Sequence, residues 1–316
     1  NRYYNKQKKY KYVDSYKRIN FELRNMLNSR YTISNDDIMN NIKNYSPNSL
    51  SKTNFITNAI NLMSAGSIKG IFGGSIKLNH VQNIIYHIES LIKYTKIETN
   101  YLIKNKKSIS KTVYNLNPNN KETAVCCGIY LGHFPEDNCS YWEVFKPMCI
   151  LLNNYISDKF SNLMRTEKQL GYIAYSTLIN INEDNNTQLY QIFVIQTNVK
   201  NCKDIIQDYI QNILQNDINS ITKEQFNSLK KGMFLDLMET PQNIIEEILQ
   251  NFKAIKLNRL DYNNEEKFYR KRIMAKCVMK FTRSLFIKWF NTINKKIHTL
   301  EINPIGQGDI QEINSN

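Results

Sequence analysis

The segment that decides the fold is Phe160-Ser-Asn-Leu-Met-Arg-Thr-Glu-Lys-Gln-Leu-Gly-Tyr-Ile-Ala-Tyr-Ser176. Its first part continues a helical pattern that ends near Arg165, Gly171 breaks the pattern, and an apolar strand pattern starts at Tyr172. A helix end followed by a strand start can bring the Arg165 guanidinium and the Tyr172 phenol to one side. Both groups are hydrogen-bond donors that suit peptide carbonyls or a developing oxyanion. The spacing by itself favours ordinary helix capping and packing at a sheet edge over such a site.

Strands and helices alternate on both sides of this segment. Residues 124–131 are a mostly apolar run that predicts a strand, and an amphipathic stretch over 140–167, interrupted by Pro147, predicts a long helix. Residues 171–178 and 188–196 predict the two strands of a hairpin. Further helices are expected at 201–215, 222–239, 242–256 and 274–292, and a closing strand is expected at 297–302. We therefore expect an α+β fold, an antiparallel sheet with helices packed on one face.

The first third of the chain predicts helices followed by a polar interval. Helical patterns lie at 16–27, 51–65 and 81–92. Residues 96–121 are rich in Asn and Lys and carry no clear apolar period. We take this interval as a boundary, which divides the chain into a first domain at 1–105 and a second domain at 106–316.

The composition is that of a globular protein with excess positive charge. Of its 316 residues 41% are apolar, which excludes a disordered chain. No apolar run approaches about 20 residues, so no membrane span is predicted. The net charge of +14 accompanies an abundance of Asn, Lys and Ile that we attribute to an AT-rich coding sequence. The first eighteen residues contain seven basic residues and five tyrosines, a composition that could bind a nucleic-acid backbone. We expect a solvated terminus instead, because no nucleic-acid module follows.

The sequence contains no self-contained catalytic centre. Compact zinc sites such as HxxEH place two histidines close together, whereas none of the four histidines lies within five residues of another: His80, His87, His133 and His298. The six cysteines contain no CxxC pair. We expect surface or capping roles for the histidines. Free thiols favour a reducing compartment, such as the cytoplasm.

One motif carries a family resemblance. The run from Leu163 to Tyr172 resembles the LRTKEQLGY signature of the insulysin-type zinc metalloendopeptidases, in the pitrilysin family. Met164 replaces a leucine of the signature, and Glu167-Lys168 appear in reversed order. Weaker similarities to this family follow one another in the same order along nearly the whole chain, at 59–67, 127–128, 221–226 and 281–302.

The resemblance implies an architecture and a division of labour. Known members have four homologous α+β domains, of which the first two hold HxxEH and the zinc, and the last two close over it to form a chamber for small unfolded peptides. This chain begins with Asn1 and resembles most of the carboxy-terminal half. Residues 1–105 would be the later part of the third domain and 106–316 the fourth. The Zn²⁺ cofactor would then be bound by the amino-terminal half, the main partner of this chain, with no metal ligand here.

The resemblance also implies roles for Arg165 and Tyr172. Both would reach across the chamber to donate hydrogen bonds to the substrate backbone, and the Tyr172 hydroxyl would stabilise the tetrahedral oxyanion. The fragment alone would be inactive. An alternative is a pseudopeptidase half that binds peptides or assembles with a partner without catalysis. Polyanions are further candidate ligands because of the basic charge, whereas nucleic acid and membrane partners are not expected.

Overall fold

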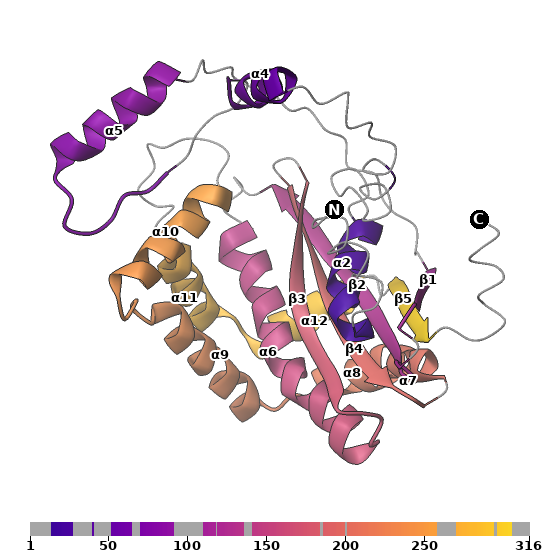
Figure 1. Cartoon of the computed structure of the whole chain (residues 1–316). Helices are drawn as coiled ribbons and strands as arrows, with labels where there is room; N and C mark the ends of the chain where they lie inside the picture. Colours follow the sequence, from indigo (N-terminus) through magenta and orange to yellow (C-terminus); the bar gives the residue numbers. More distant parts are fainter. Residues whose placement is uncertain are drawn as a thin grey trace.

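The computed structural model describes residues 14–27, 40, 52–64, 70–91, 110–117, 119–135, 141–183, 186–199, 201–257, 270–293 and 296–304. Its strands are β1 (Ser110–Asn115), β2 (Thr123–Pro135), β3 (Ile173–Glu183), β4 (Asn186–Thr197) and β5 (Ile297–Pro304). Its α-helices are α2 (Ser15–Leu27), α4 (Lys52–Ser64), α5 (Leu78–Leu91), α6 (Lys146–Asn162), α7 (Cys202–Asp208), α8 (Leu214–Ser220), α9 (Lys223–Met238), α10 (Ile244–Leu257), α11 (Arg270–Lys280) and α12 (Arg283–Thr292). Three π-helical turns extend them: η3 (Tyr141–Phe145), η4 (Leu163–Glu167) and η5 (Tyr209–Ile213). Figure 1 shows the sheet between α2 on one side and α6 with its neighbouring helices on the other.

The strands form one sheet in the order β1-β5-β2-β4-β3. β2 pairs antiparallel with β4 and β5, and β3 pairs antiparallel with β4. β1 pairs parallel with β5, so the sheet is mixed. The α+β class is confirmed, but the expectation of a purely antiparallel sheet is wrong. β1 lies inside the polar interval at 96–121, where no strand is predicted. The reason is that this edge strand, Ser-Lys-Thr-Val-Tyr-Asn, has an exposed first half and therefore no apolar alternation.

The predicted hairpin is confirmed and is longer than its apolar pattern. β3 and β4 pair from Ile173 opposite Gln196 to Glu183 opposite Asn186. β4 lies inside the sheet and β3 is at its edge. Tyr172 therefore lies immediately before an edge strand, where the chain arrives from a helix.

Two helix boundaries differ from their predictions. Pro147 does not interrupt the helix at 140–167, because it lies in the first turn of α6, where a proline is tolerated. The single helix expected at 274–292 is divided into α11 and α12. Thr282 begins the second of these, since its side chain accepts a hydrogen bond of 3.2 Å from the Leu285 N–H.

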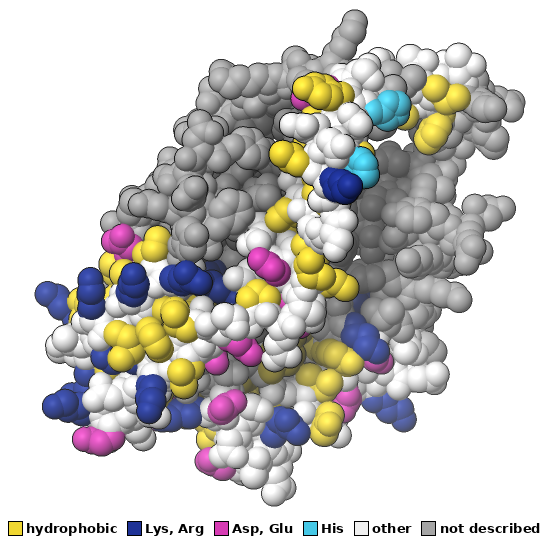
Figure 2. All heavy atoms as spheres, turned by 90° about the vertical axis from the view of Figure 1, so that its left-hand side faces the viewer, with side chains coloured by type: hydrophobic (Ala, Val, Ile, Leu, Met, Phe, Trp, Pro, Cys, Tyr) yellow, Lys and Arg dark blue, Asp and Glu magenta, His cyan; other side chains and the backbone are white. Residues whose placement is uncertain are grey.

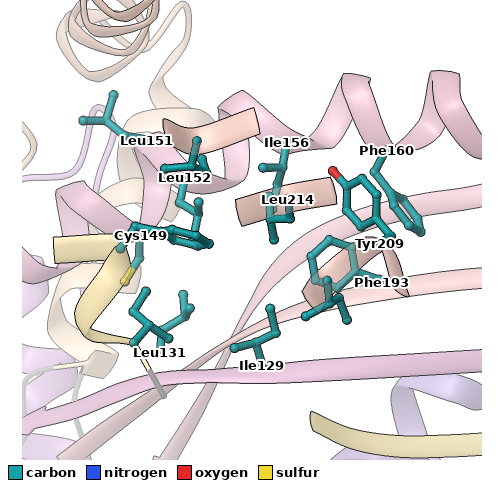
Figure 3. Packing of buried hydrophobic residues seen from close by; sticks show 14 of the residues in the cluster. Ile129, Leu131, Cys149, Leu151, Leu152, Ile156, Phe160, Phe193, Tyr209 and Leu214 are labelled. Carbon is teal, nitrogen blue, oxygen red and sulfur yellow. The ribbon is translucent and has the colours of Figure 1, made fainter. Parts of the chain in front are cut away.

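The main hydrophobic core lies between the sheet and the helices α6, α7, α8, α9, α11 and α12. Three rings meet at its centre, with centroids 5.1 Å apart for Phe160–Phe193, 5.1 Å for Phe160–Tyr209 and 5.7 Å for Phe193–Tyr209. All three are edge-to-face contacts between fully buried side chains of α6, β4 and η5. Figure 3 shows these rings between the helix and the strands. The core therefore fixes α6 against the hairpin.

A second core covers the opposite face of the sheet, so the expectation of helices on one face only is wrong. Ile19 and Leu23 of α2 are buried against apolar side chains that include Ile192 and Leu300. Arg18 and Glu22 form a buried ion pair of 3.0 Å, and Arg18 also donates to the Tyr114 carbonyl of β1 at 2.9 Å. α2 had been expected from its periodicity, but the pattern carries no information about which face of a distant sheet it covers. The domain division at residue 105 remains a prediction.

The remaining described part of the predicted first domain consists of helices and a glycine-containing connection. α4 and α5 confirm the helices expected at 51–65 and 81–92. The connection between them approaches α10, because a Cβ on Gly73 would lie 2.5 Å from Ile248 Cδ1. The sheet that the resemblance implies for this domain remains a prediction. No helix within the described ranges is both long and apolar enough to cross a membrane.

Truncation of the central aromatic contact should destabilise the sheet and the helices packed on it. Phe193→Ala removes a fully buried ring, for which we expect a loss of about 3–5 kcal/mol in the free energy of unfolding. Urea denaturation followed by circular dichroism measures this loss. The matched control is Phe55→Ala, at a 64% exposed position, which should change stability by less than about 0.5 kcal/mol. Equal effects of the two substitutions would contradict this assignment of the core.

The buried ion pair should tie α2 to the sheet. Glu22→Gln removes the carboxylate that pairs with the buried Arg18 guanidinium, so we expect a loss of about 3–5 kcal/mol in the free energy of unfolding, measured by urea denaturation. Asp14→Asn is the control, because the Asp14–Lys17 pair is exposed and should contribute about 0–1 kcal/mol. If both variants behave alike, α2 does not depend on its buried charges.

Candidate functional site

Arg165 lies on a π-helical turn that continues α6. In η4 a backbone hydrogen bond joins residues five apart in sequence, rather than four as in an α-helix. The Lys168 N–H donates to the Leu163 carbonyl at 2.8 Å. Phe160 and Met164 point into the core and are fully buried, whereas Arg165 and its successors up to Gln169 are exposed. The apolar side of the helix end is therefore anchored, and Arg165 is presented to solvent from a fixed backbone.

The turn from Arg165 to Tyr172 is held at several points. The Leu170 N–H donates to the Met164 carbonyl at 2.9 Å, and the Leu170 side chain is buried. Gln169 adopts a left-handed backbone with a φ of 51°. Gly171 is required by close approach, because a Cβ there would lie 2.3 Å from the Gln196 carbonyl oxygen of β4. Only a residue without a side chain allows this contact.

The structure brings the two predicted site residues together. The Arg165 guanidinium lies over the Tyr172 ring, with its central carbon 4.9 Å from the ring centroid. Such a cation–π contact at an exposed site contributes about 0.5–1 kcal/mol. The Tyr172 side chain is 83% exposed, an unusual value for an aromatic residue. The stack thus presents a phenol and a guanidinium to solvent as one unit.

The donor groups of this unit are available for a ligand. In the part of the chain that the structure describes, neither the Arg165 guanidinium nor the Tyr172 hydroxyl has a hydrogen-bond or ion-pair partner. The nearest acid in sequence, Glu167, accepts a hydrogen bond of 3.0 Å from Asn162 instead. An arginine fork and a phenol that are not used internally can donate to carbonyl or carboxylate oxygens of a bound molecule.

Among the residues that the structure describes, the cysteine thiols do not form a competing centre. Burial raises the pKa of the Cys127 and Cys202 thiols to about 12, and it also raises the pKa of the Cys126 and Cys149 thiols well above the ordinary value. These thiols are therefore protonated at neutral pH and are poor nucleophiles. Cys277, less buried, also has a raised pKa, mainly through desolvation.

The four histidines are dispersed, and they do not join the Arg165–Tyr172 site. His80 and His87 are exposed on α5, and His133 is bonded to the Tyr130 hydroxyl. His298 is buried in β5 against the Tyr190 ring. Within the described ranges, no three His, Cys, Asp or Glu side chains are close enough together to hold a metal ion. The surface roles expected for His80, His87 and His133 agree with their exposure, but the role expected for His298 does not, because this residue is part of the second core.

One residue of the site has no signal in the sequence. Thr197 is buried at the end of β4, and its hydroxyl donates to the Leu170 carbonyl between Arg165 and Tyr172. It lies 27 residues away along the chain, so no local pattern connects it to the turn. The hairpin register, with Ile173 opposite Gln196, would have been needed to find it. Gly171 was recognised as a breaker, but its contact with β4 likewise depends on that register.

Comparisons with known proteins show a match of part of the sequence to a family model and a similarity of the fold to solved structures. A family model described as PQQ synthase PqqF-like, C-terminal lobe domain 4, matches residues 151–252. No curated protein sequence matches significantly. Pitrilysin has a similar structure, with a TM-score of 0.73 and 14% identity over 97% of this chain and 31% of pitrilysin. The chain thus spans about a third of the length of pitrilysin.

Shorter solved structures share the fold over most of the chain. A protease from Helicobacter pylori matches with a TM-score of 0.54 and 15% identity, over 73% of this chain and 53% of that protein. A peptidase M16 inactive domain from Pseudomonas fluorescens matches with a TM-score of 0.50 and 12% identity, over 74% and 52%. At such identities the likeness concerns the fold alone. The chain therefore has the pitrilysin fold over nearly its whole length, and the segment that holds Arg165 and Tyr172 matches the fourth domain of the carboxy-terminal lobe of PqqF-like proteins.

Proposed function

We propose that this chain is the carboxy-terminal half of an insulysin-type zinc metalloendopeptidase, in which Arg165 and Tyr172 bind the backbone of a peptide at the cleavage site. The observation that carries the proposal is the exposed stack of the Arg165 guanidinium on the Tyr172 phenol. The signature-like sequence around the stack and the match of residues 151–252 to a peptidase-family lobe support it.

The two donors have different tasks in this proposal. The Tyr172 hydroxyl donates to the carbonyl oxygen of the scissile peptide bond, where negative charge develops during hydrolysis. The Arg165 guanidinium donates to a neighbouring backbone carbonyl and fixes the position of the peptide. Because charge develops only in the transition state, the phenol contributes mainly to kcat, and the loss of such a donor costs about 2.7–4 kcal/mol of barrier. The guanidinium acts on both ground state and transition state.

The metal belongs to the other half in this proposal. The described residues of this chain include no group that fits a zinc ion, and the resemblance assigns HxxEH to the amino-terminal half. Zinc would supply the Lewis-acid chemistry that activates water and polarises the carbonyl. This chain would contribute the opposite wall of the chamber, with donors for small unfolded peptides.

A second candidate function is a pseudopeptidase half. A specific observation favours it: the structure from Pseudomonas fluorescens, which shares the fold, is described as an inactive domain. In this alternative the same donors would hold a peptide or an assembly partner without hydrolysis. An intact HxxEH in the amino-terminal half of the parent protein separates the two candidates.

Polyanion binding remains a further proposal for the basic surface. Exposed basic side chains occur on α9, α11 and α12, including Lys231, Arg272, Lys276, Lys280 and Lys288. Figure 2 shows Lys and Arg side chains on this side of the molecule, interspersed with acidic and apolar ones. Such a mixture favours a solvated face as much as a dedicated anion site.

Removal of the Tyr172 hydroxyl tests the catalytic role directly. The chain is combined with the zinc-bearing half of its parent, and turnover of a quenched fluorogenic peptide is measured with and without a zinc chelator. We expect chelator-sensitive activity whose kcat falls about 100–1,000-fold in Tyr172→Phe. Tyr175→Phe, three residues later in β3, is the matched control and should retain activity. Cleavage by this chain alone would contradict the proposal, and peptide binding without cleavage in every sample would favour the pseudopeptidase half.

Replacement of Arg165 tests the substrate-positioning role. Arg165→Gln removes the fork and the charge, so we expect kcat/KM to fall about 10–100-fold with a contribution from a raised KM. Arg165→Lys should recover only part of this loss, because an ammonium cannot donate two parallel hydrogen bonds. Arg272→Gln, an exposed arginine on α11, is the control. If Arg165→Gln and Arg272→Gln have the same kinetics, Arg165 does not bind the substrate.

A further inference from the structure

The connection between Arg165 and Tyr172 is fixed from the neighbouring strand. Arg165 depends on α6 through buried Met164, and Tyr172 depends on the hairpin through β3. Between them, the Leu170 carbonyl accepts a hydrogen bond from the Thr197 hydroxyl. This is a contact across 27 residues of sequence, and it joins the last residue of β4 to the turn. The relative position of guanidinium and phenol therefore depends on β4.

The Thr197 hydroxyl uses both its donor and its acceptor capacity. It donates to the Leu170 carbonyl and accepts a hydrogen bond of 3.0 Å from the Val199 N–H. Only 1% of Thr197 is exposed, so water cannot replace either partner easily. A hydroxyl that is satisfied on both sides has one orientation, and it holds the Leu170 peptide group in one orientation as well.

The Leu170 peptide group controls where Tyr172 begins. Gly171 lies against the Gln196 carbonyl so closely that no side chain fits. Since the Gly171 N–H belongs to the same peptide plane as the Leu170 carbonyl, rotation of that plane would move Gly171 out of this contact. Thr197 and Gly171 thus act on one peptide plane, two residues before Tyr172.

We infer that Thr197 is the positioning residue of the Arg165–Tyr172 stack, and that its hydroxyl aligns the two donors for a peptide backbone. This inference deepens the proposed function and rests on it for the identity of the ligand. Thr197 is buried and touches no substrate, so it acts through the Leu170 carbonyl. A threonine that merely stabilised the fold would affect unfolding without changing the stack.

A spectroscopic readout tests the positioning without requiring peptidase activity. A fluorotyrosine placed at position 172 of the full chain reports the guanidinium above its ring through its fluorine NMR shift. Arg165→Gln, which removes the cation, defines the shift of an unstacked ring. We expect Thr197→Val to move the signal toward that value and Thr197→Ser to retain the wild-type shift, because serine keeps the hydroxyl. An unchanged shift in Thr197→Val overturns the inference.

A control variant separates positioning from loss of stability. Thr282 is another threonine whose hydroxyl binds the backbone, at the start of α12. Thr282→Val should lower the melting temperature but leave the fluorine shift of the stack at its wild-type value. If Thr282→Val moves the signal as far as Thr197→Val does, the effect is general destabilisation and the inference fails.

Kinetics with the zinc-bearing half connect the stack to catalysis. We expect Thr197→Val to lower kcat/KM about 10–100-fold, mainly through kcat, as a small misplacement of catalytic groups does. Thr197→Ser should restore the rate. A moved signal with unchanged kcat overturns the inference. A moved signal in a protein whose wild-type form cleaves no peptide supports the positioning geometry and refutes the proposed function, so the two failures are distinguishable.

Discussion

The contact of Phe160 with Phe193 and Tyr209 is the interaction on which the rest of the structure depends. It joins α6, β4 and η5 in the centre of the main core, with ring centroids 5.1 to 5.7 Å apart. Because the helix is held there, Met164 one turn later is also buried and Arg165 has to face solvent. Because the same contact holds β4, the end of that strand lies beside the turn that leads to Tyr172. A surface site with free donors is thus supported by a core that contains none of its residues.

Much of this arrangement follows from local patterns. The β3–β4 hairpin, α6 and α9 were predicted because their apolar periods are strong and because turn residues mark their ends. β1 and the packing of α2 were not predicted. The strand partner of β1 lies nearly 200 residues further along the chain, and α2 contacts β1 about 100 residues away. For the site, the sequence indicated Arg165 and Tyr172, and only the hairpin register could bring in Thr197. Local propensity therefore predicts elements, whereas register and long-range pairing need the folded chain.

The site is chemically incomplete in an informative way. The site offers two donors for carbonyl oxygens, whereas the buried thiols elsewhere in the chain are protonated and the histidines are dispersed among the described residues. Donors without a base or an electrophile can bind and orient a backbone but cannot hydrolyse it. The chain corresponds to about a third of the length of pitrilysin, whose fold it shares. The proposed function accordingly places the remaining chemistry on a second surface that faces this one.

The position of β5 in the sheet has a consequence for biosynthesis. β5 is the last described strand in the sequence, yet it lies between β1 and β2. During translation β1 has no neighbour until β5 has left the ribosome, so its unpaired backbone and the apolar face beneath α2 stay open through the synthesis of all intervening helices. A nascent chain can close the hairpin early, whereas the main core also needs Val278 of α11 and Phe286 of α12, and the sheet needs β5. β5 is then inserted between β1 and β2, so the sheet closes only after residues 297–304 have been synthesised.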